Sequence, residues 1–139
     1  MKLYSTRQFV YPGWLPRSRG CCRLAVYRDK DEVLVLLRDH YECGGPSLTN
    51  AFERAAEAVH GEVLRPLGLE GLPTRWVYWE AADGAASEVV FQDPIHFRGP
   101  SWKYLSPEAL RELLRRFGGE EDLEASLQAG EVFFRRGAS

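Results

Sequence analysis

The pattern of apolar and polar positions in the first third of the chain predicts an antiparallel strand pair. Residues 22–27 (CRLAVY) alternate between polar and apolar side chains, and residues 32–37 (EVLVLL) are a nearly continuous run of β-forming residues. Such alternation and such short apolar runs are typical of strands. The four polar residues between them, 28–31, fit the connection of a hairpin. We therefore expect two neighbouring strands, the second of them central in its sheet.

A second strand pair is predicted in the middle of the chain. Residues 75–80 (RWVYWE) and 88–92 (EVVFQ) are rich in aromatic and β-branched side chains. The Asp83-Gly84 pair between them is a turn signal. These segments are therefore expected to form another antiparallel pair.

The N-terminal segment and the stretch after the second strand pair have weaker patterns. Residues 7–11 have the composition of a short strand, but the prolines and glycines that follow interrupt it. Two interpretations of residues 1–20 therefore stay open: a short strand at 7–11, or an arm over the domain. Residues 95–105 show no regular period and are expected to be irregular.

Between the two strand pairs, helical periodicity predicts a long helix. Its apolar side chains recur at the spacing of one helix face: Phe52, Ala55, Ala56, Val59 and Val63. Asn50 and Glu53 have the spacing of a capping box, with Ser47 and Thr49 as alternative N-caps. Pro66 cannot continue a helix, so the helix is expected to end just before it.

A second helix is expected to begin at Ser106. Serine is a favoured N-cap and Pro107 suits the first helical position, while Gly118 or the next glycine ends the apolar periodicity. Residues 120–129 predict a short acidic helix, and residues 131–136 (EVFFRR) are expected to be a last strand or a docked tail.

The order of these elements, with paired strands followed by a helix, indicates an α+β fold rather than alternating βαβ units. With 139 residues, of which 45% are hydrophobic, the chain is expected to form one domain spanning residues 1–139. The predicted architecture is an antiparallel sheet of four to five strands, with the long helix packed on one face and two shorter C-terminal helices.

Charge and cysteine content narrow the classes of function. The formal net charge of −2 argues against a dedicated DNA-binding domain. No apolar run reaches the roughly 18–20 residues of a membrane span, and the N-terminus lacks the apolar core of a signal peptide. The three cysteines are an odd number. We therefore expect a cytoplasmic protein with reduced thiols, no membrane contact and no cofactor.

Four potential metal ligands lie within five residues: Asp39, His40, Glu42 and Cys43. Ligands this dense in sequence are difficult to fold around one ion, and no second ligand pair with zinc spacing occurs. The segment is therefore interpreted as a polar loop that joins strand to helix, and no metal site is predicted.

The candidates for catalysis are three side chains of the long helix and one on the second strand pair: Glu53, Glu57, His60 and Glu80. The three helix residues share one side by i, i+3 and i+4 spacing. They would form an acid–base group if Glu80 approached them. The same spacing is typical of a solvated helix face, and that alternative stays open.

The candidates for binding a partner are Trp14, Trp79, Trp102 and Asn50. Trp76 and Trp79 are three residues apart on a predicted strand, so they should face opposite sides of the sheet. One should belong to the core, and the other must be covered by a helix, the N-terminal arm or a partner. An exposed aromatic strand face would be an interface, with self-association as its simplest form.

Basic residues near two of these tryptophans suggest an alternative. Arg17, Arg19, Arg23 and Lys103, with the arginine pairs at 115–116 and 135–136, could form a patch beside Trp14 and Trp102. Aromatic side chains among positive charges bind single-stranded nucleic acid by stacking. The acidic residues 120–122 would neutralise part of this patch.

Several segments resemble sequences of small bacterial proteins. Residues 45–53 (GPSLTNAFE) are similar to their G-x-S-x-T-N-A-x-E segment, and residues 102–108 (WKYLSPE) to their later W-x-x-L-S-x-E segment. Those proteins also have a strand beginning Cys-Arg-Leu, as at 22–24. The resemblance covers roughly residues 22–114, differs around 76–80, and implies no particular activity.

The function expected from these features is a non-enzymatic, cytoplasmic protein-interaction module that forms a homodimer through its sheet. One alternative is a small hydrolase-like enzyme that uses carboxylate and histidine groups near the first helix. The other is a single-stranded nucleic-acid binder that uses the patch of arginine and tryptophan.

Overall fold

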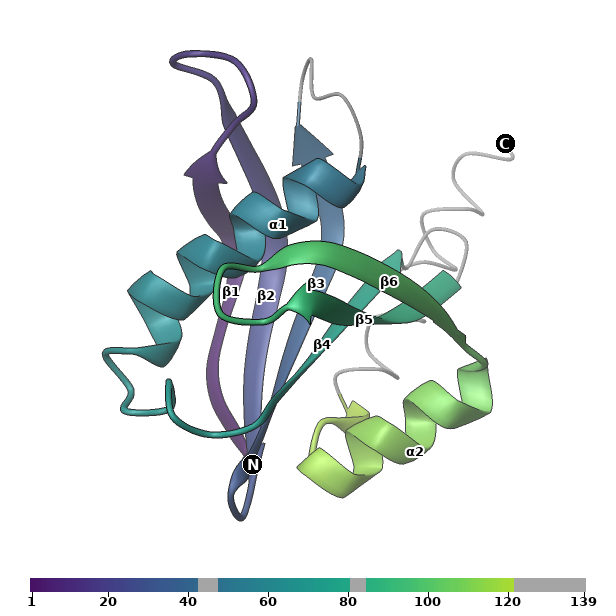
Figure 1. Cartoon of the computed structure of the whole chain (residues 1–139). Helices are drawn as coiled ribbons and strands as arrows, with labels where there is room; N and C mark the ends of the chain where they lie inside the picture. The colour runs from purple at the N-terminus through teal and green to yellow at the C-terminus, as the bar shows by residue number, and fades with distance from the viewer. Residues whose placement is uncertain (43–47, 81–84, 122–139) are drawn as a thin grey trace.

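The computed structural model of the protein describes residues 1–42, 48–80 and 85–121 (Figure 1). Six strands form one sheet in the order in which they occur in the chain. They are β1 (Lys2–Pro12), β2 (Arg19–Asp29), β3 (Glu32–Glu42), β4 (Thr74–Glu80), β5 (Ala85–Asp93) and β6 (Arg98–Leu105). β3 and β4 pair in parallel, and all other neighbours pair antiparallel.

The predicted antiparallel sheet of four to five strands is therefore wrong in strand number and in direction. The predicted pairs are confirmed as β2–β3 and β4–β5, although their predicted turn at 83–84 lies outside the described residues. The helix between them returns the chain to the end of the sheet at which β3 begins, so β3 and β4 run in the same direction. A helical crossover of this kind is how parallel strands are joined.

The two edge strands have weak sequence signals. The N-terminal segment is β1, which spans Lys2–Pro12 and pairs with β2, so the short strand at 7–11 is part of a longer one and the segment is not an arm. The stretch expected to be irregular contains β6, which pairs with β5. An edge strand has a partner on one side only, and both edge strands contain many exposed side chains. Their sequences therefore lack the apolar period of the central strands.

The long helix is confirmed as α1 (Leu48–Val59), which continues directly into a π-helical turn, η1 (His60–Leu64). Phe52, Ala55 and Ala56 are buried against the sheet. Because α1 begins at Leu48, Asn50 is its third residue rather than its N-cap. The alternative cap at position 47 lies outside the described residues.

The second helix is confirmed as α2 (Pro107–Phe117). The Ser106 hydroxyl accepts a hydrogen bond from the Ala109 backbone N–H at 3.1 Å, and Gly118 closes the helix with a left-handed φ of 81°. Ser106 is the predicted N-cap, and Gly118 is the first of the two glycines predicted to end the helix. The predicted helix at 120–129 and the tail at 131–136 lie mostly or wholly outside the described residues.

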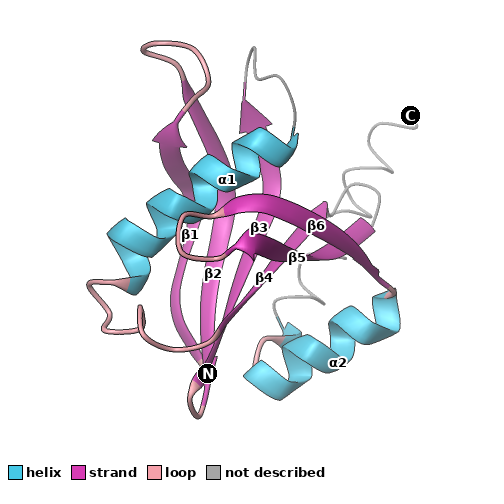
Figure 2. Cartoon of the chain, viewed as in Figure 1, coloured by secondary structure: helices cyan, strands magenta, loops and turns pink. Residues whose placement is uncertain are grey.

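The two helices lie at different parts of the sheet (Figure 2). Buried residues form two separate cores, one beneath α1 and one beneath α2, on opposite faces of the sheet. Trp76 packs in the core beneath α1, and Trp79 packs in the core beneath α2. The prediction that these tryptophans face opposite sides is confirmed. No helix in the described part of the chain is long and apolar enough to cross a membrane.

Candidate functional site

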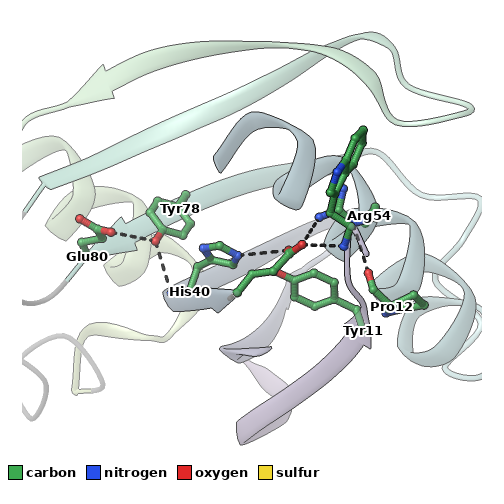
Figure 3. A network of polar contacts seen from close by, with 8 residues as sticks. Tyr11, Pro12, His40, Arg54, Tyr78 and Glu80 are labelled. Atoms are coloured by element: carbon green, nitrogen blue, oxygen red, sulfur yellow. Dashed lines mark hydrogen bonds and ion pairs between the residues drawn. The ribbon is translucent and has the colours of Figure 1, made fainter. Parts of the chain in front are cut away.

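A polar cluster lies at one end of the sheet, where β1, β3 and β4 all terminate. β1 and β3 are each antiparallel to β2, so they run in the same direction, and β4 is parallel to β3. Their carboxyl ends therefore bring Pro12, Glu42 and Glu80 to the same end of the sheet. The first turns of α1 contribute Arg54 to this end of the sheet (Figure 3).

Glu42 is the centre of the cluster, and its side chain is only 1% exposed. One carboxylate oxygen, Oε1, accepts hydrogen bonds from the guanidinium of Arg54 and from the backbone N–H of Trp14, the latter at 2.7 Å. The other oxygen, Oε2, accepts a longer bond from the Tyr11 hydroxyl at 3.5 Å. A buried carboxylate needs such donors because transfer out of water costs several kcal/mol.

A glycine in the middle strand makes the approach of Tyr11 to Glu42 possible. Tyr11, Gly20 and Glu42 are register partners across β1, β2 and β3. A Cβ atom on Gly20 would lie 2.4 Å from the Tyr11 ring. The tyrosine therefore lies across β2 where only a glycine leaves room, a use of strand glycine that permits close approach.

Arg54 connects the helix to the loop that joins β1 and β2. Its Nε donates to the carbonyl of Pro12 at 3.2 Å, in addition to its ion pair with Glu42. Its guanidinium carbon lies 5.8 Å from the centre of the Trp14 ring, within cation–π range. Trp14 is nevertheless 55% exposed, and the following residue, Leu15, is 50% exposed. An exposed apolar tip is thus held by a buried ion pair.

His40 lies between this ion pair and β4. A β-bulge in β3, with Asp39 at a φ of 52°, places the His40 ring 6.2 Å from that of Tyr11. The imidazole Nε2 lies 3.7 Å from Oε2 of Glu42. Burial lowers the pKa of His40 below its usual value, against the opposing effect of the Glu42 carboxylate. At neutral pH the imidazole is therefore uncharged.

Tyr78 joins β3 to the end of β4. Its hydroxyl accepts a hydrogen bond from the His40 backbone N–H at 3.3 Å and donates to Glu80 at 3.1 Å (Figure 3). Burial raises the pKa of the Tyr78 and Tyr11 hydroxyls above their usual range, so both stay protonated. The tyrosines therefore act here as neutral hydrogen-bonding groups.

A small hollow adjoins the cluster beside the α1 core. It is lined by Cys22, Leu37, His40, Phe52, Ala55 and Tyr78. Its empty volume of about 190 Å³ includes space open to solvent, and typical ligand pockets measure roughly 300–1,000 Å³. Burial raises the pKa of Cys22 to about 12, so its thiol stays protonated. A protonated thiol is a poor nucleophile and a poor metal ligand.

The four residues predicted for catalysis do not converge. Glu53 accepts hydrogen bonds from the Arg98 side chain and from the Gly99 backbone, which ties α1 to the start of β6. Glu57 is exposed, and the His60 ring packs on Phe97. The last candidate, Glu80, accepts the bond from Tyr78. Within the described ranges, no hydrogen bond or ion pair joins any two of these four side chains.

The four residues predicted for binding have different environments. Trp14 is at the surface, as described above. Trp79 is 1% exposed in the α2 core, with the guanidinium of Arg38 4.8 Å from its ring, so it cannot form a surface patch. Trp102 is half-buried, with its ring 5.3 Å from that of Phe52. Asn50 is half-buried in the first turn of α1.

Part of the predicted basic patch is paired with carboxylates. Arg115 contacts Glu112 and Glu120, and Arg116 contacts Asp29 and Glu32. The Arg23 side chain lies 4.0 Å from that of Asp39. The pair at 135–136 lies outside the described residues.

No group of three or more His, Cys, Asp or Glu side chains converges on a common point in residues 1–42, 48–80 and 85–121. The dense segment at 39–43 is split by the β-bulge. Asp39 turns towards Arg23, while His40 and Glu42 belong to the buried cluster. Residue 43 lies outside the described ranges.

Sequence reasoning missed Tyr11 and Arg54, and it considered Glu42 only as a metal ligand. One available signal was Gly20, because a glycine inside a strand often marks a close approach of another group. The second was the position of Arg54 beside the apolar stripe of α1. Neither signal identifies Glu42 as the residue that Tyr11 and Arg54 contact, because that contact depends on how β1 and β3 align in the sheet.

Comparison with known proteins identifies no matching family model, no similar curated protein and no similar solved structure. Function therefore rests on the geometry of the described residues.

Proposed function

We propose that the protein is a non-enzymatic interaction module that binds a partner macromolecule through the tip of the β1–β2 loop. The observation that supports this proposal is that Trp14 is exposed and yet held in place by buried residues. The residue is 55% exposed, yet its backbone N–H is bonded to the buried carboxylate of Glu42 and its ring lies within cation–π range of Arg54. Tryptophan and arginine are the residues that most often dominate binding energy at protein interfaces.

The energetics of the ion pair favour a role beyond stability. Burying Glu42 and most of Arg54 removes two charges from water, and the attraction between them rarely exceeds that cost by much. Apolar residues of similar size would stabilise a core at least as well. What the pair adds is a fixed loop, since it bonds both the Pro12 carbonyl and the Trp14 N–H. A loop fixed before binding loses less entropy when a partner docks.

The protonation states in the cluster support binding rather than catalysis. The Tyr11 and Tyr78 hydroxyls and the Cys22 thiol are held in their protonated forms by burial. The carboxylate of Glu42 already accepts three hydrogen bonds. A general base or nucleophile needs a reactive form near neutral pH and access to a substrate. The hydrolase alternative has no such arrangement among the described residues in its favour.

The proposed location is the cytoplasm. Cys21 and Cys22 are both free thiols, and such residues persist in reducing compartments. This proposal would be contradicted by fractionation of source cells that recovers the protein outside the cytoplasm.

Site-specific photo-crosslinking in source cells tests the proposed contact. A benzophenone amino acid replaces Leu15 at the tip of the loop in one variant. The matched control carries it at Ile95, another exposed aliphatic residue, in the β5–β6 connection. We expect one discrete adduct from position 15 and none of that size from position 95. Equal labelling at both positions, or no adduct from position 15, would contradict the proposal.

A further inference from the structure

We infer that the partner is a protein whose surface offers an apolar pocket rimmed by carboxylates, into which Trp14 inserts. This inference rests on the proposed function and adds the chemistry of the partner. It follows from the distribution of charge around the tip, from the pairing state of the arginines, and from the kind of apolar side chains at the tip.

Charge is strongly segregated along the chain. The first 27 residues contain five basic side chains and no acidic one. They are Lys2, Arg7, Arg17, Arg19 and Arg23. Because the whole chain has 18 basic and 20 acidic residues, the remaining 112 have 13 basic and 20 acidic ones. Residues 1–27, which form most of the β1–β2 hairpin, are therefore a positive segment of a chain with a net negative charge, and such asymmetry steers and selects oppositely charged partners.

The arginines beside the tip are available for a partner. The side chains of Arg17 and Arg19 are exposed, and neither side chain forms a hydrogen bond or ion pair with a described residue. By contrast, Arg75, Arg98 and Arg116 each pair with a carboxylate. Unpaired arginine fits a planar carboxylate with two parallel hydrogen bonds. The positive charge next to Trp14 therefore favours an acidic rim on the partner.

The apolar side chains at the tip favour a protein over a nucleic acid. Residues 14–16 (WLP) combine a single aromatic ring with two aliphatic side chains. Single-stranded nucleic acids bind by stacking successive bases on successive aromatic rings. The exposed ring of Tyr41 does not extend a stacking platform with Trp14, because Tyr41 neighbours Glu42 on β3 and so faces the opposite side of the sheet. Leu15 and Pro16 instead suit a pocket of matching shape.

A second copy of this chain is a less favourable partner, although residues 28–139 have more acidic than basic side chains. The basic hairpin of one copy on the acidic surface of another is a head-to-tail contact. Such contacts form open-ended chains unless the rotation closes a ring. We therefore assign the partner as a different protein, and self-association is an outcome of the test that would contradict this assignment.

The test is the yield and composition of the adduct from position 15 in charge-reversed backgrounds. The test variant carries Arg17→Glu and Arg19→Glu, and the control carries Arg7→Glu. Arg7 is exposed, lies in the same hairpin away from the tip, and forms no side-chain hydrogen bond or ion pair with a described residue. Both are checked for unchanged thermal unfolding. We expect the adduct yield to fall by about tenfold or more in the test variant and by less than about twofold in the control.

Mass spectrometry of the adduct completes the test. The inference predicts a protein adduct that resists nuclease and whose crosslinked peptide lies beside surface carboxylates. An adduct that survives the reversal of Arg17 and Arg19 would leave the proposed interaction intact and overturn the acidic partner. An adduct removed by nuclease, or one made of two copies of this chain, would overturn it equally. Absence of any adduct from position 15 when Arg17 and Arg19 are unchanged would contradict the proposed function itself.

Discussion

At the scale of single residues, the geometry around Glu42 connects the interior of the protein to its exposed tip. The carboxylate is 1% exposed, and its donors come from α1, from β1 and from the β1–β2 loop. Each donor fixes a different segment of chain relative to β3. Gly20 is a necessary part of this geometry because any larger residue would displace Tyr11.

The ion pair between Glu42 and Arg54 should contribute more to the position of the loop than to stability. We expect Glu42→Gln to lower the free energy of unfolding by about 2–4 kcal/mol, because it leaves Arg54 without its counter-charge, and Arg54→Met to act similarly. The double variant Glu42→Leu with Arg54→Met should lie within about 1 kcal/mol of the parent. Denaturant unfolding gives these values.

The double variant also separates stability from function. It removes the bonds to the Pro12 carbonyl and the Trp14 N–H, so the loop is no longer fixed. The adduct from position 15 should therefore decrease although the fold is retained. If the double variant is as unstable as the single ones, the ion pair stabilises the fold, which would contradict its assignment to positioning the loop.

His40 should make stability depend on pH. Burial lowers its pKa in the folded state, so the unfolded chain binds a proton first as the pH falls. The free energy of unfolding is therefore fully retained above the unfolded pKa of about 6.5 and decreases below it, by at most about 1.4 kcal/mol per pH unit. Urea unfolding between pH 8 and pH 5 measures the slope. His40→Gln should flatten it, and an unchanged slope would assign the effect to other groups.

At the scale of elements, the termini of α2 show how much local sequence can determine. The Ser106 hydroxyl caps the first turn, and Gly118 closes the last with a left-handed backbone. Both follow from residue type and spacing alone. We expect Ser106→Ala to lower the free energy of unfolding by about 1 kcal/mol. The control Ser101→Ala, on the exposed side of β6, should change it by less than about 0.5 kcal/mol. Equal losses would mean that the cap contributes nothing.

The elements that could not be predicted depend on long-range pairing. β2, β3 and α2 have strong local patterns, and the sequence is sufficient to find them. β6 contains Gly99 and Pro100 and has only one neighbouring strand, so its sequence resembles a loop until β5 aligns with it. The parallel pairing of β3 with β4 depends on where the crossover helix delivers the chain, which no local pattern encodes.

The candidate site illustrates the same limit. The exposed Trp14 could be recognised as a binding candidate from its residue type, and it is at the surface. Its partners could not, because Glu42 and Arg54 lie 28 and 40 residues away along the chain. The predicted helix carboxylates are used for other contacts, as Glu53 shows by bonding to Arg98 and Gly99.

At the scale of the whole molecule, both edges of the sheet have features that oppose pairing with another strand. β1 has two register irregularities in its pairing with β2, and its exposed residues include Lys2 and Arg7. β6 contains Pro100, which lacks a backbone N–H, together with the exposed Lys103. Bulges, proline and charge are the devices by which natural sheets avoid edge-to-edge association. We therefore expect these features to oppose a dimer formed by pairing of edge strands.

Light scattering of the purified chain tests this protection. We expect a mass near the 15.8 kDa of one chain that does not rise with concentration. Pro100→Thr combined with Lys103→Thr returns a backbone N–H to the edge and removes its charge, so that variant should associate as concentration rises. Lys103→Thr alone keeps the proline and should remain a single chain. If the parent protein already has twice the mass of one chain, these edges do not prevent pairing, and the predicted homodimer is supported.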